Sequence, residues 1–381
     1  MQINSTKSVS LIFFLFLLLF SLARLQIGSS YLTLVGGALF TFLYLISLPL
    51  LTSGKGINKS SFWILCTYLI FQTTYILRYS EYTKDETLGN IVFSVFYGIL
   101  MFIVSNLKWN ELHIKTLSYI PIIIYPIVMI YMQWNQDVVN PNQLAILVFI
   151  LSYFSLIYSV GFKTKSKYKL FSLITLAVLF FTGSRTALLC AAFVILTVII
   201  WKRITRSKFL FNFYFVSIAI FGFIVTVVYP NLYKILPNFD VYNYYMIKYT
   251  GKSINSGRDQ IWGVIGDIVM NKPFFGHGAG AIPVDFTNWE LSSHNQFLQI
   301  ALQVGLVGLA ILILVLFLIW NQFWKNRNDK RVMLTASYFI GIIVYQLFEV
   351  TLTHNATASV IQWMILGLGL SFAWSKSPSE N

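Results

Sequence analysis

Residues 295–320 have the sequence NQFLQIALQVGLVGLAILILVLFLIW and carry no charged side chain over 26 positions. A helix of about 20 apolar residues crosses the hydrocarbon core of a bilayer. Backbone N–H and C=O groups in lipid must be hydrogen-bonded internally, and a single continuous segment achieves this only as a helix. This stretch therefore predicts a transmembrane helix.

The same apolar character extends over the whole chain of 381 residues. Hydrophobic residues make up 57% of it and charged residues 10%, whereas a soluble domain carries about 25% charged residues. This composition excludes an ordinary soluble protein, and the high hydrophobicity excludes a disordered one. The sequence predicts an all-α, polytopic membrane protein with about 12 transmembrane helices. The twelve apolar segments are 9–27, 31–51, 60–77, 88–105, 116–133, 142–161, 168–182, 186–201, 209–229, 295–320, 332–349 and 354–374.

The distribution of Lys and Arg predicts how these helices are oriented. With the N-terminus inside, 18 of the 27 Lys and Arg residues fall on the cytoplasmic side, as expected for a multi-pass protein. The formal net charge of +14 then reflects the Lys and Arg residues that orient the helices in the membrane. No nucleic-acid partner is expected, because no basic run alternates with aromatic residues as a binding groove requires.

Three regions follow from this topology. Residues 1–229 hold spans 1–9, residues 230–293 form a large extracytoplasmic loop between spans 9 and 10, and residues 294–381 hold spans 10–12 and a short cytoplasmic tail. A long connection in a compact protein is usually functional or disordered. The tyrosine-rich stretch 229–249, YPNLYKILPNFDVYNYYMIKY, fits either an interfacial aromatic belt or a surface that stacks on sugars, and both interpretations remain open.

No metal site and no cofactor are predicted. Cys66 and Cys190 lie within apolar runs, and the four histidines show no HExxH spacing, so neither a disulfide framework nor a zinc site is indicated. The glycine run 276–280, GHGAG, follows a helix and a turn rather than a strand. It therefore predicts a tight structural turn and not a nucleotide-binding loop.

Arg185 lies in the run FTGSRTALL, between Lys169 and Lys202. The stretches on its two sides have 15 and 16 residues, so each helix reaches roughly 22–24 Å, short of a hydrocarbon core of about 30 Å. The chain is therefore expected to turn at 183–185 below the outer surface, inside the protein. A charged Arg there costs several kcal/mol unless it is paired. An anion site, an ion pair with an acidic residue of another helix, and snorkelling to the interface are the alternatives.

Arg258 lies in the run NSGRDQIWGVIGDIV, residues 255–269. Ser256 and Asp259 have the spacing of a capping box, which predicts a helix start. A cation at a helix N-terminus opposes the helix dipole, so its presence favours an anion site at this end. The alternative is a surface Arg on a loop helix. The residues expected on the apolar face of this helix are Ile261, Ile265 and Ile268.

His294 opens the tenth predicted span, near the outer surface. Histidine is the usual general base near neutral pH, although a lone histidine here also fits an interfacial or hydrogen-bonded role. Arg185, Arg258 and His294 all fall at helix starts on the same outer side, and this convergence favours a shared site. For Glu349 and His354, which bracket the last outer turn, packing or ion-pair roles are expected.

Five short motifs occur within the predicted membrane topology: GSRT at 183–186, SGRDQIW at 256–262, PFFGHGAG at 273–280, HNQFLQ at 294–299 and GLVGL at 305–309. Each is weak alone. In this order and on this topology, they resemble the O-antigen ligase/polymerase superfamily. Members of that superfamily have many membrane helices and a large outer loop before a late span. The resemblance implies a GT-C-like architecture.

The resemblance implies a metal-independent, inverting glycosyl transfer from undecaprenyl diphosphate, with the active site on the extracytoplasmic side of the bacterial cytoplasmic membrane. It assigns stabilisation of the leaving diphosphate to Arg185 and Arg258, and the general-base role to His294. Asn295, in the same motif as His294, is expected to bind substrate. These roles agree with the chemistry, since cations stabilise a developing anion and an attacking hydroxyl needs a base.

The sequence is compatible with three functions. A polysaccharide polymerase, joining one lipid-linked repeat unit to another, is favoured because the outer loop is compact and carries no added domain. An O-antigen ligase, which transfers the glycan to lipid A-core, shares the same motifs. A lipid-linked oligosaccharide flippase or other transporter is disfavoured, because the key cations cluster on the outer side and no half-repeat is evident. The expected partners are undecaprenyl-diphosphate-linked oligosaccharide and membrane lipids, with a chain-length regulator and a flippase as candidate protein partners.

Overall fold

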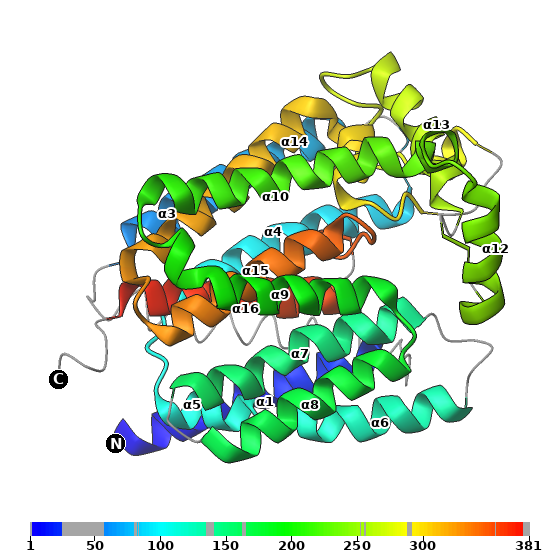
Figure 1. The fold of residues 1–381 in the computed structure, drawn as a ribbon. Helices are drawn as coiled ribbons and strands as arrows, with labels where there is room; N and C mark the ends of the chain where they lie inside the picture. Colours follow the sequence, from blue (N-terminus) through cyan, green and yellow to red (C-terminus); the bar gives the residue numbers. More distant parts are fainter. Residues whose placement is uncertain are drawn as a thin grey trace.

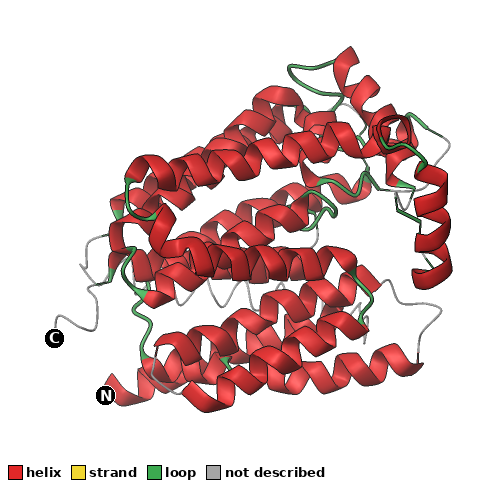
Figure 2. Ribbon diagram, in the orientation of Figure 1, coloured by secondary structure: helices red, strands yellow, loops and turns green. Residues whose placement is uncertain are grey.

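In the computed structural model of the protein, the described residues are 2–24, 57–79, 82, 84–134, 141–161, 165–251, 253–254, 257–287, 292–354 and 356–375. Every regular element in these ranges is a helix, as Figure 2 shows. The predicted all-α class is therefore confirmed.

The long helices follow the apolar segments of the sequence (Figure 1). They are α1 (Gln2–Arg24), α3 (Lys59–Leu77), α4 (Asp85–Asn106), α6 (Ile120–Trp134), α7 (Pro141–Gly161), α8 (Lys165–Phe181), α9 (Arg185–Ile204), α10 (Lys208–Val228), α14 (Gln296–Phe323), α15 (Lys330–Gln346) and α16 (Ala356–Trp374). The short helices are α5 (Glu111–Leu117), η1 (Tyr229–Asn231), α11 (Leu232–Ile235), α12 (Phe239–Thr250), α13 (Arg258–Asn271), η2 (Pro283–Asp285) and η3 (Trp324–Asn326).

Eight helical segments in the described residues are long and apolar enough to cross a membrane. They are 59–77, 87–106, 111–133, 142–161, 185–204, 208–235, 296–326 and 357–374. The protein is therefore polytopic, whereas the predicted count of twelve stays a prediction. The second predicted span, 31–51, lies outside the described residues, and α8 and α15 have only 17 residues each.

The bundle is built around α16, which packs against α4, α7 and α15. Of the candidate spans, α16 and α7 are the most buried, with 83% and 78% of their apolar windows inside the protein. Aromatic stacking joins α14 to α10, where the rings of Trp320 and Phe211 lie 4.2 Å apart at 11°. The outer helices shield α7 and α16, so these two have apolar residues on every face.

The loop that follows α13 inserts its backbone into a break in α14. Gly305 has φ 72° and ψ −174°, a conformation that essentially only glycine adopts. The break frees backbone groups, and the loop binds them. The amide N–H of His277 donates to the carbonyl of Leu302 at 2.8 Å, and the N–H of Leu306 donates to the carbonyl of Pro273 at 2.7 Å. Broken helices are tolerated in membrane proteins where other groups satisfy the backbone in this way.

Both glycine motifs of the sequence meet at this junction. A Cβ atom on Gly276 would lie 2.6 Å from the backbone of Gln303, and one on Gly305 would lie 2.2 Å from the carbonyl oxygen of Phe274. The tight turn predicted for 276–280 is therefore present, because Gly276 adopts a positive φ of 65°. The turn fixes the loop against α14 through backbone contact.

The second half of the tyrosine-rich stretch forms α12, which buries none of its residues. Its exposed aromatic side chains include Tyr242, Tyr244, Tyr245 and Tyr249. Exposure suits both an interfacial belt and a sugar-stacking surface, so the two interpretations stay open.

A Gly305→Ala substitution tests the junction. We expect it to lower the free energy of unfolding by about 1–3 kcal/mol from backbone strain alone, and by more if the loop is displaced. Gly263→Ala is the matched control, because Gly263 lies within α13 with open space at its Cβ position. There alanine should be neutral, or stabilise by up to about 1 kcal/mol. Thermal unfolding in one detergent measures both, and equal stability of the two variants would contradict the role of the junction.

Candidate functional site

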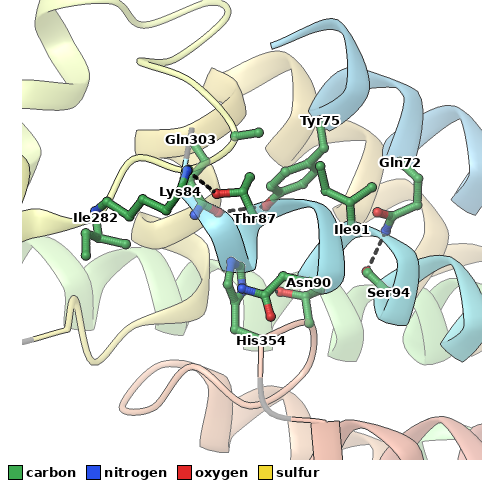
Figure 3. A pocket seen from close by; sticks show the side chains of 13 residues that line it. Gln72, Tyr75, Lys84, Thr87, Asn90, Ile91, Ser94, Ile282, Gln303 and His354 are labelled. Carbon is green, nitrogen blue, oxygen red and sulfur yellow. Dashed lines mark hydrogen bonds between the residues drawn. The ribbon is translucent and has the colours of Figure 1, made fainter. Parts of the chain in front are cut away.

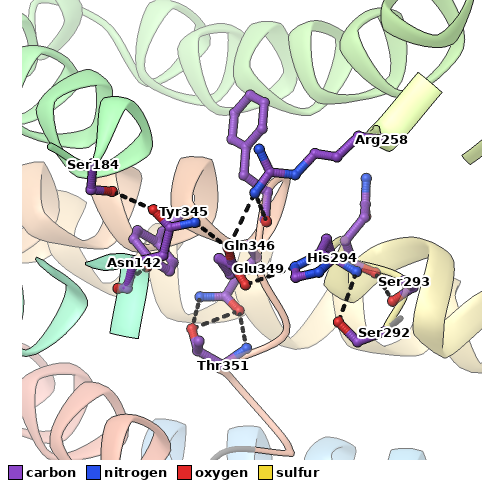
Figure 4. A network of polar contacts seen from close by, with 12 residues as sticks. Asn142, Ser184, Arg258, Ser292, Ser293, His294, Tyr345, Gln346, Glu349 and Thr351 are labelled. Carbon is purple, nitrogen blue, oxygen red and sulfur yellow. Dashed lines mark hydrogen bonds and ion pairs between the residues drawn. The ribbon is translucent and has the colours of Figure 1, made fainter. Parts of the chain in front are cut away.

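The carboxylate of Glu349 is the centre of a polar cluster, shown in Figure 4. Glu349 follows α15, and its backbone N–H donates to the carbonyl of Tyr345 at 3.1 Å. Its Oε1 accepts hydrogen bonds from Arg258 Nη2 at 3.1 Å and from Asn142 Nδ2 at 2.8 Å. Its Oε2 lies 3.1 Å from Nδ1 of His294. One acid therefore joins α7, α13 and the start of α14.

Arg258 is the first residue of α13, and its side chain reaches this carboxylate. The helix docks through Trp262 and Ile265, which are both buried, and Trp262 Nε1 donates to the carbonyl of Ser293 at 2.8 Å. Nη2 of Arg258 also donates to the carbonyl of Phe348 at 3.1 Å. The side chain is only 12% exposed, and its Nε is buried without a hydrogen-bond partner in the described part of the chain.

The start of α13 differs slightly from the prediction. A capping box of Ser256 and Asp259 would make Ser256 the cap residue, but the helix begins one residue later, with Gly257 at the N-cap and φ at 74°. Ser256 lies outside the described residues. The predicted amphipathic face is confirmed, because Ile261 and Ile265 are buried and Ile268 packs against the same cluster.

His294 is held by its backbone and by its ring. It has a positive φ of 47°, which is uncommon outside glycine and marks a constrained position. The ring contacts Glu349 through Nδ1. Because a carboxylate only accepts, Nδ1 carries the proton of the neutral ring and Nε2 keeps a lone pair. The side chain is 24% exposed, so this geometry suits a base supported by an acid.

Arg185 is linked to the cluster indirectly. The preceding residue, Ser184, is buried and caps α9, and its Oγ donates to Asn142 Oδ1 at 2.8 Å. Asn142 in turn binds Glu349. The predicted turn between α8 and α9 is present, but Arg185 itself is exposed, and its Nη2 donates to the carbonyl of Ser253 at 3.1 Å. Arg185 thus contacts the segment that leads into α13.

Asn295 has a structural role. It is fully buried, and its Oδ1 accepts from the N–H groups of Phe297 and Leu298 at the start of α14. Its Nδ2 donates to Thr226 at 3.1 Å. Both ends of the side chain are therefore engaged in fixing the helix, and its expected contact with substrate stays a prediction.

Of the four predicted site residues, the structure brings Arg258 and His294 onto one carboxylate, whereas Arg185 is linked to it only through the neighbouring Ser184 and Asn142. For Glu349 a packing or ion-pair role is predicted, and the ion pair with Arg258 is present. What the sequence missed is that the same carboxylate also contacts His294. A signal was available, because an acidic residue at the end of a membrane span is costly and tends to be paired or functional.

The shared ion pair has a testable energetic signature. Glu349→Leu leaves the cation of Arg258 in a largely buried position, and we expect it to cost about 3–5 kcal/mol of stability. Adding Arg258→Met removes that unpaired charge, so the double variant should be more stable than Glu349→Leu alone. Thermal unfolding of the two single variants and the double variant measures this. Costs that simply add would mean that the two side chains do not interact.

Comparison with known proteins finds a family match over part of the chain. Residues 170–313 match the family model described as O-Antigen ligase, and this range includes Arg185, Arg258 and His294. No curated protein and no solved structure matches the chain. Over residues 170–313 the match confirms the predicted resemblance to the O-antigen ligase/polymerase superfamily, and it supports a polysaccharide-related, glycosyltransferase-like function.

Proposed function

We propose that this protein is a polysaccharide polymerase, an inverting glycosyltransferase of the GT-C type. It transfers a glycan from undecaprenyl diphosphate to a sugar hydroxyl of a second lipid-linked repeat unit, on the outer face of the bacterial cytoplasmic membrane. The observation that carries the proposal is the contact of Glu349 with both His294 and Arg258. It puts a base and a cation beside each other, and this reaction needs both.

In the proposed reaction, Nε2 of His294 takes the proton of the acceptor hydroxyl as its oxygen attacks the anomeric carbon. The bond between that carbon and the diphosphate oxygen breaks, and undecaprenyl diphosphate leaves. Because attack and departure occur on opposite sides of the carbon, the anomeric configuration inverts. Glu349 holds the ring through Nδ1 and stabilises the imidazolium that forms.

The leaving diphosphate gains negative charge, which arginine side chains stabilise. Arg258 supports this role because its Nε is a buried donor with no partner among the described residues. The start of α13 adds a second attraction, since Gly257 provides no side-chain cap and the first N–H groups of a helix bind anions. Arg185, exposed at the start of α9, is the second cation in this proposal.

A ligase is the second candidate. The matched family model carries the description O-Antigen ligase, and the chemistry proposed for His294 and the arginines is the same for a lipid A-core acceptor. The two functions differ in the acceptor alone. The compact outer segment between α10 and α14 favours the polymerase.

The test uses purified protein and a defined undecaprenyl-diphosphate-linked repeat unit, without nucleotide or added metal. We expect a ladder of products on a gel, and a loss of roughly 10²–10⁴-fold in rate for His294→Ala, the range for a general base. His113→Gln is the matched control. His113 is the N3 residue of the capping box that begins α5, at the predicted cytoplasmic side, and glutamine is favoured at N3 of such a box.

The outcomes separate the candidate functions. A ladder that His294→Ala forms at the wild-type rate would contradict the proposed base. Product formed only after lipid A-core is added would establish a ligase instead of a polymerase. No transfer to either acceptor, with a substrate that a positive-control enzyme uses, would contradict glycosyl transfer and favour the transporter.

A further inference from the structure

A second feature lies at the far end of the segment 349–354, which begins with Glu349. It is a cavity of about 410 Å³ between the ends of α3, α4 and α14, closed by the loops at 279–282 and 353–354 (Figure 3). This volume is in the range of pockets that hold small molecules. The topology predicted from the basic residues puts all these ends on the outer side, the side of the His294 cluster.

The described residues of its wall combine polar and apolar groups and carry little charge. Amides and hydroxyls of α3, α4 and α14 line it, including Gln72, Ser94 and Gln303. Lys84 is the cation among its lining residues, and Nζ of Lys84 is bound to Asp285 at 2.8 Å. No carboxylate is among the described residues that line it. Such a wall suits a ligand rich in hydroxyl groups and without charge.

His354 also lines the cavity and adds no charge near neutral pH. Burial lowers the pKa of this histidine, in the loop before α16, to about 4. Its Nδ1 lies 2.7 Å from the hydroxyl of Thr353. The ring is therefore neutral and serves as a hydrogen-bonding group, as amides and hydroxyls do.

Hydrogen bonds within the wall hold its shape before any ligand binds. Tyr75 donates to Gln303 Oε1 at 3.0 Å, and Gln303 Nε2 donates to the carbonyl of Ala281 at 3.2 Å. On α4, Ser94 accepts from Gln72 Nε2 at 2.8 Å. A wall fixed in this way binds with less loss of conformational freedom.

The cavity is joined to the His294 cluster through two short connections. Gln296, two residues after His294, donates to the hydroxyl of Thr353 at 2.7 Å and accepts from the N–H of Leu352 at 3.1 Å. Along the other connection, the chain passes from Glu349 to Thr353 within five residues. A ligand in the cavity would therefore lie close to the start of α14, which carries His294.

We propose that this cavity binds the acceptor glycan through an uncharged, hydroxyl-bearing sugar, and so presents an acceptor hydroxyl towards His294. The proposal rests on the proposed glycosyl transfer, because it assigns the second substrate of that reaction. The donor diphosphate is assigned to Arg258 and Arg185, since Lys84, the lysine among the described residues that line the cavity, is already paired with Asp285. In this arrangement the acceptor hydroxyl and the donor diphosphate lie on opposite sides of the anomeric carbon, as inversion requires.

Asn90 allows a direct test, because it lines the cavity yet is exposed at its edge on α4. Asn90→Trp should fill the cavity mouth without disturbing the core. Gly89→Trp is the matched control, since the adjacent Gly89 does not line the cavity and has open space at its Cβ position. The probe is the methyl glycoside of the repeat unit, prepared from the surface polysaccharide of the source cells. It lacks diphosphate and so serves as an acceptor only.

Binding of this glycoside to full-length protein in nanodiscs is measured by saturation-transfer NMR, with no donor present. We expect Asn90→Trp to raise Kd by roughly tenfold or more, the equivalent of about 1.4 kcal/mol. Gly89→Trp should bind as the wild type does. In the transfer assay, Asn90→Trp should raise the KM for the glycoside and leave the KM for the lipid-linked donor within about twofold of the wild-type value.

Each outcome decides one of the two proposals. No binding by the wild type, or equal binding by wild type and Asn90→Trp, would overturn the cavity assignment. A raised KM for the donor alone would show that the cavity holds the donor sugar, which also overturns it. Binding that Asn90→Trp abolishes, in a wild type that transfers nothing, would support a glycan site in the cavity and contradict the glycosyl transfer.

Discussion

The carboxylate of Glu349 holds the site together, because its two oxygens contact Arg258 and His294. It also binds Asn142, through which Ser184 at the start of α9 is tied in. A largely buried carboxylate is costly unless its oxygens are fully paired. Here that cost is offset by contacts from α7, α13 and α14, so the pairing of one acid fixes the relative positions of segments that lie far apart in the sequence.

A second constraint positions the segments around that acid. The break at Gly305 lets the loop after α13 enter α14, and backbone hydrogen bonds lock the two together. Arg258 at one end of α13 and the loop at the other end are thereby fixed against the helix that begins beside His294. The same junction lies next to the polar cavity, whose wall includes Gln303, two residues before the break. The junction at Gly305 therefore positions both the Glu349 cluster and the cavity.

Much of the fold could be predicted from the sequence, because apolar segments of membrane length become helices in lipid whatever their neighbours are. Eleven of the twelve predicted segments overlap a helix, and 31–51 lies outside the described residues. The glycine run at 276–280 was correctly expected to be a turn, but its partner, Gly305, lies 25 residues or more away. Pairings of that kind, like those of Glu349, depend on tertiary packing, which local patterns do not encode. The role of Asn295 as a cap could have been inferred, since Asn is a favoured N-cap residue.

The most direct test of this account is the coupling between Glu349 and His294 in the transfer reaction. The rate of product formation is measured for Glu349→Gln, for His294→Gln and for the double variant, with Asp329→Asn as the control for loss of another buried carboxylate paired with arginine. If Glu349 acts through His294, the double variant should be no slower than His294→Gln alone, and Asp329→Asn should keep the wild-type rate. Losses that multiply in the double variant would show that the two residues act independently and would contradict the central role given to this contact.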